Sequence, residues 1–389
     1  VSQYWGKRDM EHISRAIGVA AMLGTGLTVV LAAVLYLWPV EIMDLLSNNH
    51  ELSVLGAPYL KLIGISYVFN MLSSLYVSAR RSAEDAGFGM KLFAMSTVLN
   101  TGLNYLLIFG KCGLPALGIQ GAAVPTLLAR ITEFAVCSFC AVRSRLLPIQ
   151  WRAFFRPGWE MLRRFVKYSS PVILNETAWG LGNSMLTVIL GYTDNSVEML
   201  AANAVMGNLN RLFLVVCFGL GAATAVIIGK SIGEGRSHQE VMDLSRTLLV
   251  FTALVGAGLT ILSLLLVPTL FVPVVFPLFK LYGESAAIAT ALAVTGFLSI
   301  PLHAYSISAV TGVLRAGGDV FWSTLLDVGP QWCMALPLTA LLALVLKADY
   351  WWIATAIQSE SLLKVPLCAL RIRTGQWIHD VTVRKERGQ

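Results

Sequence analysis

Long apolar stretches separated by short polar connections make up most of the chain. Ten of them are close to the roughly 20 residues that an α-helix needs to cross the hydrocarbon layer of a membrane. The predicted spans are residues 14–38, 54–78, 89–109, 118–142, 166–191, 200–229, 244–272, 285–313, 321–346 and 350–371. The pattern predicts an all-α polytopic membrane protein, and an even number of spans predicts that both termini lie on the same side.

Charge distribution gives this arrangement an orientation. Of the 389 residues, 56% are apolar and only 13% are charged, with a net charge of +7. Most Lys and Arg residues lie in alternate connections, as Arg80 and Arg81 do. The positive-inside rule therefore predicts that both termini are cytoplasmic, in a multi-pass protein of the cell's inner membrane. This clustering excludes a nucleic-acid partner, and the lipid bilayer is the expected surrounding.

The longest and most basic connection lies in the middle of the chain. It contains Pro148, Pro157 and three aromatic residues between its arginines. We interpret residues 146–165 as a basic amphipathic linker on the cytoplasmic membrane surface. It joins an N-lobe, residues 1–145, to a C-lobe, residues 166–371, and residues 372–389 follow as a cytoplasmic tail.

Two sequence matches between the halves indicate an internal repeat. SQYWGKRD (2–9) resembles GKSIGEGR (229–236), and ARRSAEDAG (79–87) resembles LRAGGDVF (314–321). Both matches lie in basic turns and occur in the same order, so the halves share one orientation. Parallel repeats of this kind are typical of transporters that bind substrate between two lobes. The first half is shorter by about 60–70 residues, the length of two spans, so we expect a 6+6 parent fold that has lost its first two helices.

Four segments carry a resemblance to a known family. They resemble motifs of the multidrug and toxic-compound extrusion (MATE) transporters. The segments are LNYLLIFGKCGLPALGIQGAAVPTLLAR (103–130), PVILNETAW (171–179), FGLGAATAVIIGKSIGEGR (218–236) and GVLRAGGD (312–319). The resemblance implies two six-helix lobes around a central cavity, with family helices 3–6 in the N-lobe and 7–12 in the C-lobe. It further implies export of organic cations or amphipathic compounds by antiport with H⁺ or Na⁺, without another cofactor.

The resemblance also implies a coupling residue. In several relatives a glutamate of the seventh helix serves the coupling cation, and Glu176 is the matching position. The tenth-helix aspartate of some sodium-coupled relatives has no counterpart, since that stretch reads SIPLHAYSIS (299–308), with His303 and Tyr305. The helices expected to be missing would also remove any acidic cation site that they carry.

Glu176 stands out independently as a carboxylate in the middle of an apolar span. Trp179, Gly180 and Asn183 share its helical face, and Asn175 is its neighbour in sequence. A charge in hydrocarbon costs at least about 2.5–3.5 kcal/mol, so such groups are functional sites by default. Proton and cationic substrate could exclude each other at this carboxylate, and Trp179 could meet the substrate through its ring face. The alternatives are a structural ion pair for the carboxylate and lipid packing for the ring.

Other polar residues within the spans are candidates for the site or for structural contacts. Asn203 lies on a face with Arg211, and we expect it either to join helices by hydrogen bonding or to line the substrate site. Arg211 is a candidate ion-pair partner of Glu176 or of Glu133. Asp327 is unpaired in sequence and is the second candidate for a coupling group.

Two charged pairs are spaced as one-turn neighbours on their own helices. Arg130 and Glu133 are three residues apart, and Glu360 and Lys364 are four apart. We interpret both as structural ion pairs rather than proton relays. A lone histidine such as His303 is more often a packing residue.

Three functional readings were compared. The favoured one is a monomeric multidrug efflux transporter for small-molecule substrates. The alternative is a flippase for lipid-linked precursors or polysaccharides, which would need a basic cavity, whereas acids and bases within these spans are nearly matched. A membrane-embedded enzyme is excluded because the sequence has no HExxH motif, protease pattern or metal cluster.

Overall fold

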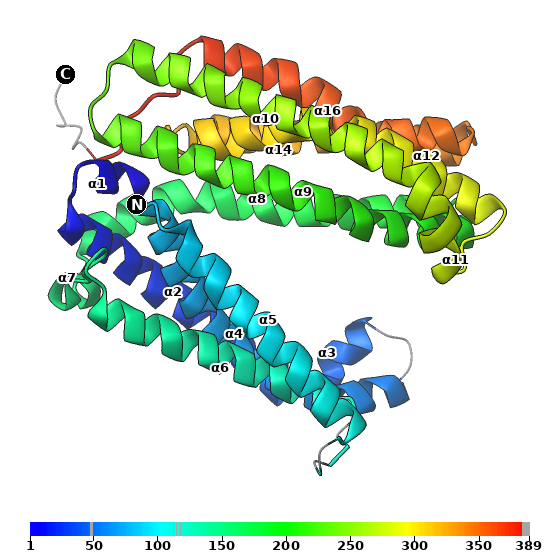
Figure 1. The fold of residues 1–389 in the computed structure, drawn as a ribbon, viewed down its shortest axis with the longest axis horizontal. Helices are drawn as coiled ribbons and strands as arrows, with labels where there is room; N and C mark the ends of the chain where they lie inside the picture. Colours follow the sequence, from blue (N-terminus) through cyan, green and yellow to red (C-terminus); the bar gives the residue numbers. More distant parts are fainter. Residues whose placement is uncertain (47–49, 112, 114, 117, 383–389) are drawn as a thin grey trace. The chain divides into compact units, whose positions relative to one another are not determined.

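The computed structural model describes residues 1–46, 50–111, 113, 115–116 and 118–382. All regular elements among these residues are helices (Figure 1). The first seven are α1 (Ser2–Gly6), α2 (Met10–Leu37), α3 (Pro39–Leu46), α4 (His50–Ser82), α5 (Ala86–Phe109), α6 (Gln120–Arg143) and α7 (Trp151–Phe155). The next six are α8 (Trp159–Gly191), α9 (Ser196–Gly233), α10 (His238–Leu266), the π-helix η1 (Val267–Val275), α11 (Phe276–Leu278) and α12 (Glu284–Leu298). The last seven are α13 (Ile300–Ile307), the π-helix η2 (Ser308–Leu314), α14 (Val320–Pro330), the π-helix η3 (Gln331–Ala335), α15 (Leu336–Ala340), the π-helix η4 (Leu341–Val345) and α16 (Tyr350–Arg373).

Fewer helices are apolar enough to cross a membrane than the ten spans expected from the sequence. Among the described residues, seven helices are long and apolar enough to cross a membrane. The number is eight if the bent pair formed by α12 with α13 and η2 is one span. The remaining two expected spans coincide with α8 and α16, which have sufficient length. They fall short because their middles carry polar groups such as Glu176 and Lys364.

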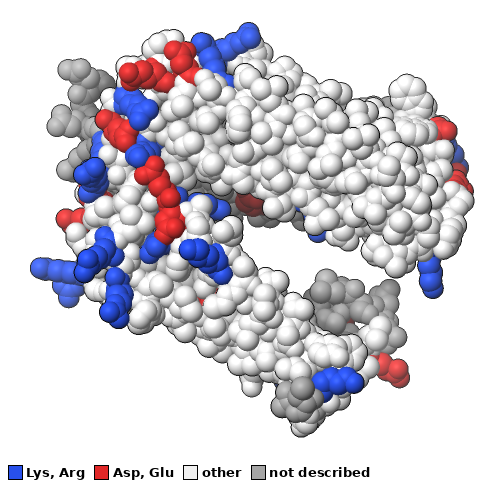
Figure 2. All heavy atoms as spheres, viewed as in Figure 1, with Lys and Arg blue, Asp and Glu red and all other residues white. Residues whose placement is uncertain are grey.

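Contacts divide the chain into two compact units. The first unit comprises Gln3–Phe165 and the second begins at Val166, so α8 starts in the first unit and continues into the second. Within each unit, charged side chains visible in Figure 2 gather at the ends of the helices, and the long sides are nearly free of them. Such sides suit a lipid environment. Of the expected tail, residues 383–389 lie outside the described residues.

The two sequence matches fold into equivalent turns. Arg8 and Gly235 occupy corresponding positions and have φ angles of 56° and 75°. In both turns the next residue donates its N–H to the carbonyl five residues earlier, from Asp9 to Tyr4 and from Arg236 to Ser231. These bonds form a Schellman motif, whose left-handed position favours glycine.

The second pair of turns repeats this geometry. Glu84 and Gly318 have φ angles of 65° and 89°. The following aspartates, Asp85 and Asp319, donate their N–H groups over the same separation, each at 3.0 Å. The sequence repeat therefore corresponds to a repeat of backbone structure in the two units.

Helix breaks shape the second unit. α12 and α13 meet at Ser299 with a bend of 47°, and Pro301 follows two residues later. π-helical segments follow α13 and α14, where each widened turn changes the direction of the side chains beyond it. The core of this unit includes Phe276, Phe297 and Ile300. The breaks direct polar side chains of α13, η2 and α14 towards the interior.

The predicted linker is only partly helical. Its helix α7 packs against α2, where the carbonyl of Phe154 lies 2.0 Å from the point that a Cβ on Gly18 would occupy. Trp151 and Phe155 are exposed, whereas Leu147 is buried. The segment therefore docks on the first unit through a few apolar contacts and leaves aromatic side chains at the surface.

Candidate functional site

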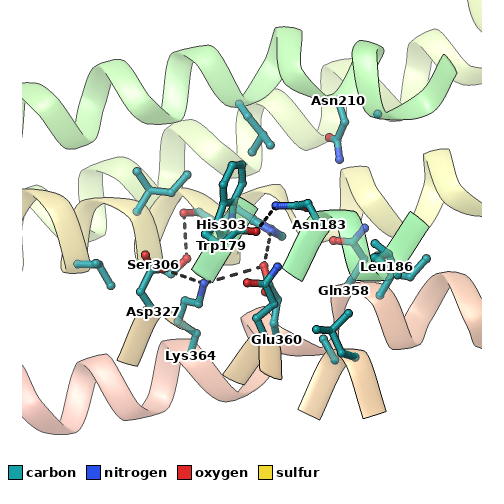
Figure 3. A pocket seen from close by; sticks show the side chains of 18 of the residues that line it. Trp179, Asn183, Leu186, Asn210, His303, Ser306, Asp327, Gln358, Glu360 and Lys364 are labelled. Carbon is teal, nitrogen blue, oxygen red and sulfur yellow. Dashed lines mark hydrogen bonds and ion pairs between the residues drawn. The ribbon is translucent and has the colours of Figure 1, made fainter. Parts of the chain in front are cut away.

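A cavity of about 280 Å³ lies within the second unit (Figure 3). Its walls come from α8, α9, α12, α13, η2, α14, η3, α15 and α16. Five of the six residues predicted from the sequence for substrate or coupling-ion binding line it, namely Glu176, Trp179, Asn183, Asn203 and Asp327. The sixth, Asn175, is buried beside the cavity and donates a hydrogen bond from its Nδ2 to Asp327 Oδ2 at 2.9 Å.

Three residues of α8 form one wall of the cavity. Glu176, Trp179 and Asn183 lie three and four residues apart and therefore share one face. Although Glu176 lies in the middle of an apolar helix, its side chain is 62% exposed. Its carboxylate borders open space rather than packed neighbours. A solvated carboxylate avoids most of the desolvation cost of a buried one.

Glu176 pairs with Arg315 rather than with Arg211. Arg315 Nη1 lies 3.0 Å from Glu176 Oε1, and its Nη2 lies 3.6 Å from Asp327 Oδ2. Arg211 is exposed, and its predicted pairing with Glu176 is wrong because that carboxylate pairs with Arg315. Its predicted pairing with Glu133 of the first unit stays a prediction. Arg315 was placed in a cytoplasmic turn by the sequence reading, and its long side chain reaches from there into the cavity.

Lys364 is the centre of a second group of charges in the cavity. Its Nζ lies 3.0 Å from Asp327 Oδ1 and 3.9 Å from Glu360 Oε1, and the side chain is only 7% exposed (Figure 3). The sequence pointed to the Glu360 contact because of its helical spacing. The closer contact joins residues 37 positions apart on different helices, where sequence spacing gives no signal. A buried lysine requires such carboxylate partners to offset its desolvation.

His303 extends this group of charges to α13. Its Nε2 lies 3.7 Å from Glu360 Oε1, and the hydroxyl of Ser361 lies within 3.2 Å of both ring nitrogens. His303 is therefore part of the polar cavity and not an isolated packing residue. Alternating acids and bases thus run from Glu176 through Arg315, Asp327 and Lys364 to Glu360 and His303.

Several uncharged polar atoms of the cavity have no hydrogen-bond partner within the described part of the chain. They are Asn210 Oδ1, Gln331 Oε1 and Thr339 Oγ1. Buried polar atoms normally form hydrogen bonds, so these acceptors can receive hydrogen bonds from water or from a bound molecule. Together with Trp179 they give the cavity the mixed polar and aromatic lining that suits an amphipathic ligand.

The remaining predicted pair lies in the first unit. Arg130 Nη1 contacts both carboxylate oxygens of Glu133 at 2.8 Å, and Glu133 is 1% exposed. Both residues border a smaller polar hollow between α5 and α6 that also includes Asn100. One guanidinium nitrogen thus contacts both oxygens of the buried carboxylate, which offsets part of its desolvation.

Comparison with known proteins gives consistent results. The MatE family model matches residues 1–106. Among curated proteins, "Probable multidrug resistance protein YoeA" of Bacillus subtilis (strain 168) is 24% identical over 352 residues, which cover 88% of this chain and 73% of the relative. The crystal structure of MATE in complex with MaL6 aligns with a TM-score of 0.79 at 16% identity, over 96% of this chain and 85% of that one.

The chain is similar to MATE proteins. A MOP superfamily transporter from Pyrococcus furiosus Vc1 (DSM3638) aligns with a TM-score of 0.82 at 17% identity, over 96% of this chain and 82% of that chain. The family resemblance and the all-α polytopic fold inferred from the sequence are confirmed. The described residues share the all-helical fold of these MATE structures, and seven or eight of their helices are long and apolar enough to cross a membrane.

Proposed function

We propose that this protein is a MATE transporter that exports organic cations or amphipathic compounds by antiport with H⁺ or Na⁺. The observation that carries the proposal is an accessible carboxylate, Glu176, in a cavity that also presents the ring of Trp179. A carboxylate attracts an organic cation, and an aromatic face adds a cation–π contact. The curated relative YoeA is named a probable multidrug resistance protein, which agrees with this reading.

Glu176 is a better candidate than Asp327 for the group that alternates between ion and substrate. Asp327 already accepts hydrogen bonds from Lys364 and Asn175 and is mostly buried. A proton or Na⁺ at Glu176 would neutralise the carboxylate and weaken its attraction for an organic cation. The two ligands would then exclude each other at one site, which supports antiport if the protein changes conformation mainly when one of them is bound.

The proposal includes the arrangement of the chain in the membrane. The lobes would be residues 1–145 and 166–371, with both termini in the cytoplasm and the linker at residues 146–165 on the inner membrane surface. The cavity would open alternately to the two sides as the lobes move, in a protein that works as a monomer. Basic turns such as the one containing Arg80 and Arg81 support this orientation by the positive-inside rule.

Ethidium efflux from drug-sensitive cells tests the function. We expect Glu176→Gln to reduce efflux at least tenfold, since the neutral amide cannot exchange H⁺ or Na⁺ for substrate. Glu160→Gln is the matched control, because Glu160 lies on the same helix but pairs with Arg164 outside the cavity. Collapse of the H⁺ or the Na⁺ gradient identifies the coupling ion. Undiminished efflux by a well-expressed Glu176→Gln protein refutes the assignment.

One observation favours a second function. Arg315 and Lys364 place two permanent cations in the cavity, which could attract a phosphate-bearing lipid precursor or polysaccharide. The lining carboxylates Glu176, Asp327 and Glu360 outnumber these cations, which favours a cationic substrate. Absence of ethidium efflux by well-expressed wild-type protein, with translocation of a lipid-linked precursor in reconstituted vesicles, would support the flippase.

A further inference from the structure

Arg315 is positioned as a cation would be when bound to Glu176. The residue follows η2 at the start of the turn before α14, and its guanidinium donates a hydrogen bond to Glu176 at 3.0 Å. The arginine side chain is 17% exposed, whereas that of Glu176 is 62% exposed. Within the described residues, no other side chain bonds to the Glu176 carboxylate.

The same guanidinium has a second carboxylate within reach. Its Nη2 lies 3.6 Å from Asp327 Oδ2 but forms no hydrogen bond, and its Nε is also unpartnered in the described part of the chain. Asp327 does not depend on Arg315, because Lys364 and Asn175 already bond to it. A short movement therefore brings Arg315 into full contact with Asp327 and releases Glu176.

We propose that Arg315 is a tethered cation that competes with the transported organic cation for Glu176. This inference rests on the proposed function and adds the residue that regulates the site. In the empty protein Arg315 occupies the carboxylate, and an arriving cation displaces the guanidinium towards Asp327. When the substrate leaves, Arg315 returns to Glu176 and opposes rebinding.

The competition should lower substrate affinity and favour substrate release. Binding must break the contact between Arg315 and Glu176, so the internal cation lowers substrate affinity. Release is aided by the same contact, because the carboxylate regains a partner as the substrate departs. Loss of the positive charge at position 315 should therefore tighten substrate binding and slow turnover.

Ethidium binding to the purified full chain tests the competition. By fluorescence titration we expect Arg315→Gln to lower the Kd about two- to fivefold, the range for loss of a partly exposed ion pair that opposes binding. Arg315→Lys keeps the charge and should bind close to wild type. Arg371→Gln is the control, because Arg371 bonds Asp319 outside the cavity, and it should leave the Kd unchanged.

A second neutral variant, Arg315→Met, guards against misfolding of the first, and folding is checked by gel filtration and helical circular dichroism. An unchanged or higher Kd in a folded neutral variant overturns the proposal, as does a Kd in Arg315→Lys equal to that in Arg315→Gln. In efflux assays, KM and kcat should both fall in the neutral variants. If the neutral Arg315 variants do not behave as expected while Glu176→Gln still abolishes efflux, only the tethered-cation proposal is refuted. If Glu176→Gln retains efflux, the proposed function itself is refuted.

Discussion

Replacement of Gly256 by alanine tests whether close helix packing holds the α13 wall of the cavity in place. Gly256 lies on α10, and a Cβ there would be 2.8 Å from Pro301 Cα and 2.9 Å from Ala304 Cβ. Non-bonded carbon atoms favour separations of about 3.5–4.0 Å. The alanine methyl group would therefore push α13, which carries His303, away from α10 by roughly 0.5–1 Å.

Two opposing effects determine how much Gly256→Ala changes the free energy of unfolding. Overpacking a well-packed contact costs about 1–3 kcal/mol, while alanine in place of a helical glycine gains about 0.5–1 kcal/mol. Gly258 lies two residues further along α10 and has no atom within 4 Å of its virtual Cβ. Gly258→Ala therefore has only the stabilising effect of alanine in a helix and no overpacking cost. The free energy of unfolding should be lower in Gly256→Ala than in Gly258→Ala by about 1–3 kcal/mol.

Unfolding of the two purified variants in the same detergent measures this difference directly. Because both substitutions are Gly→Ala on one helix, the conformational term cancels and only the contact with α13 remains. Ethidium binding should weaken in Gly256→Ala alone if displacement of α13 reaches His303. Equal stability of the two variants would show that α10 and α13 are not in the close contact described.

The remaining predictions concern the repeated turn and the end of the chain. A residue with a Cβ is strained in the left-handed conformation. Arg8→Gly should therefore raise the free energy of unfolding by about 1 kcal/mol, and Gly235→Ala should lower it by about 1–2 kcal/mol. Chemical unfolding of both variants tests these opposite effects. Trp377 is fully buried, so Trp377→Ala should cost about 3–5 kcal/mol. Trp377→Phe should lose only about 1 kcal/mol for the indole hydrogen bond to the Ile372 carbonyl, and comparison of their thermal unfolding separates the two losses.

Sequence reasoning was most successful where the signal is local. Span positions follow from runs of apolar residues, and the shared face of Glu176, Trp179 and Asn183 follows from helical spacing. The pairing of Arg130 with Glu133 is likewise a matter of neighbouring turns. Each of these features depends only on residues close together in the chain.

Contacts between distant residues could not be derived in this way. Asp327 looked unpaired because Lys364 lies on another helix, and only packing brings the two together. The exposure of Glu176 depends on which helices surround it and how much space they leave. Arg315 was missed for a further reason, since an arginine at the end of a span is normally attributed to the cytoplasmic turn.

In both units the aspartate of the repeated turn pairs with an arginine other than the one at the position of Arg315. In the first unit, Asp85 begins α5 and bonds Arg80, a residue of the preceding helix, through Nε at 2.9 Å. In the second unit, the equivalent Asp319 bonds Arg371 of α16 at 2.8 Å. The aspartate at the start of the helix thus keeps an arginine partner in both units, but in the second unit that partner comes from a different helix. Arg315 corresponds in the repeat to Arg81, which likewise is not the described partner of Asp85. Neither arginine serves the aspartate, so the Arg315 guanidinium can serve Glu176.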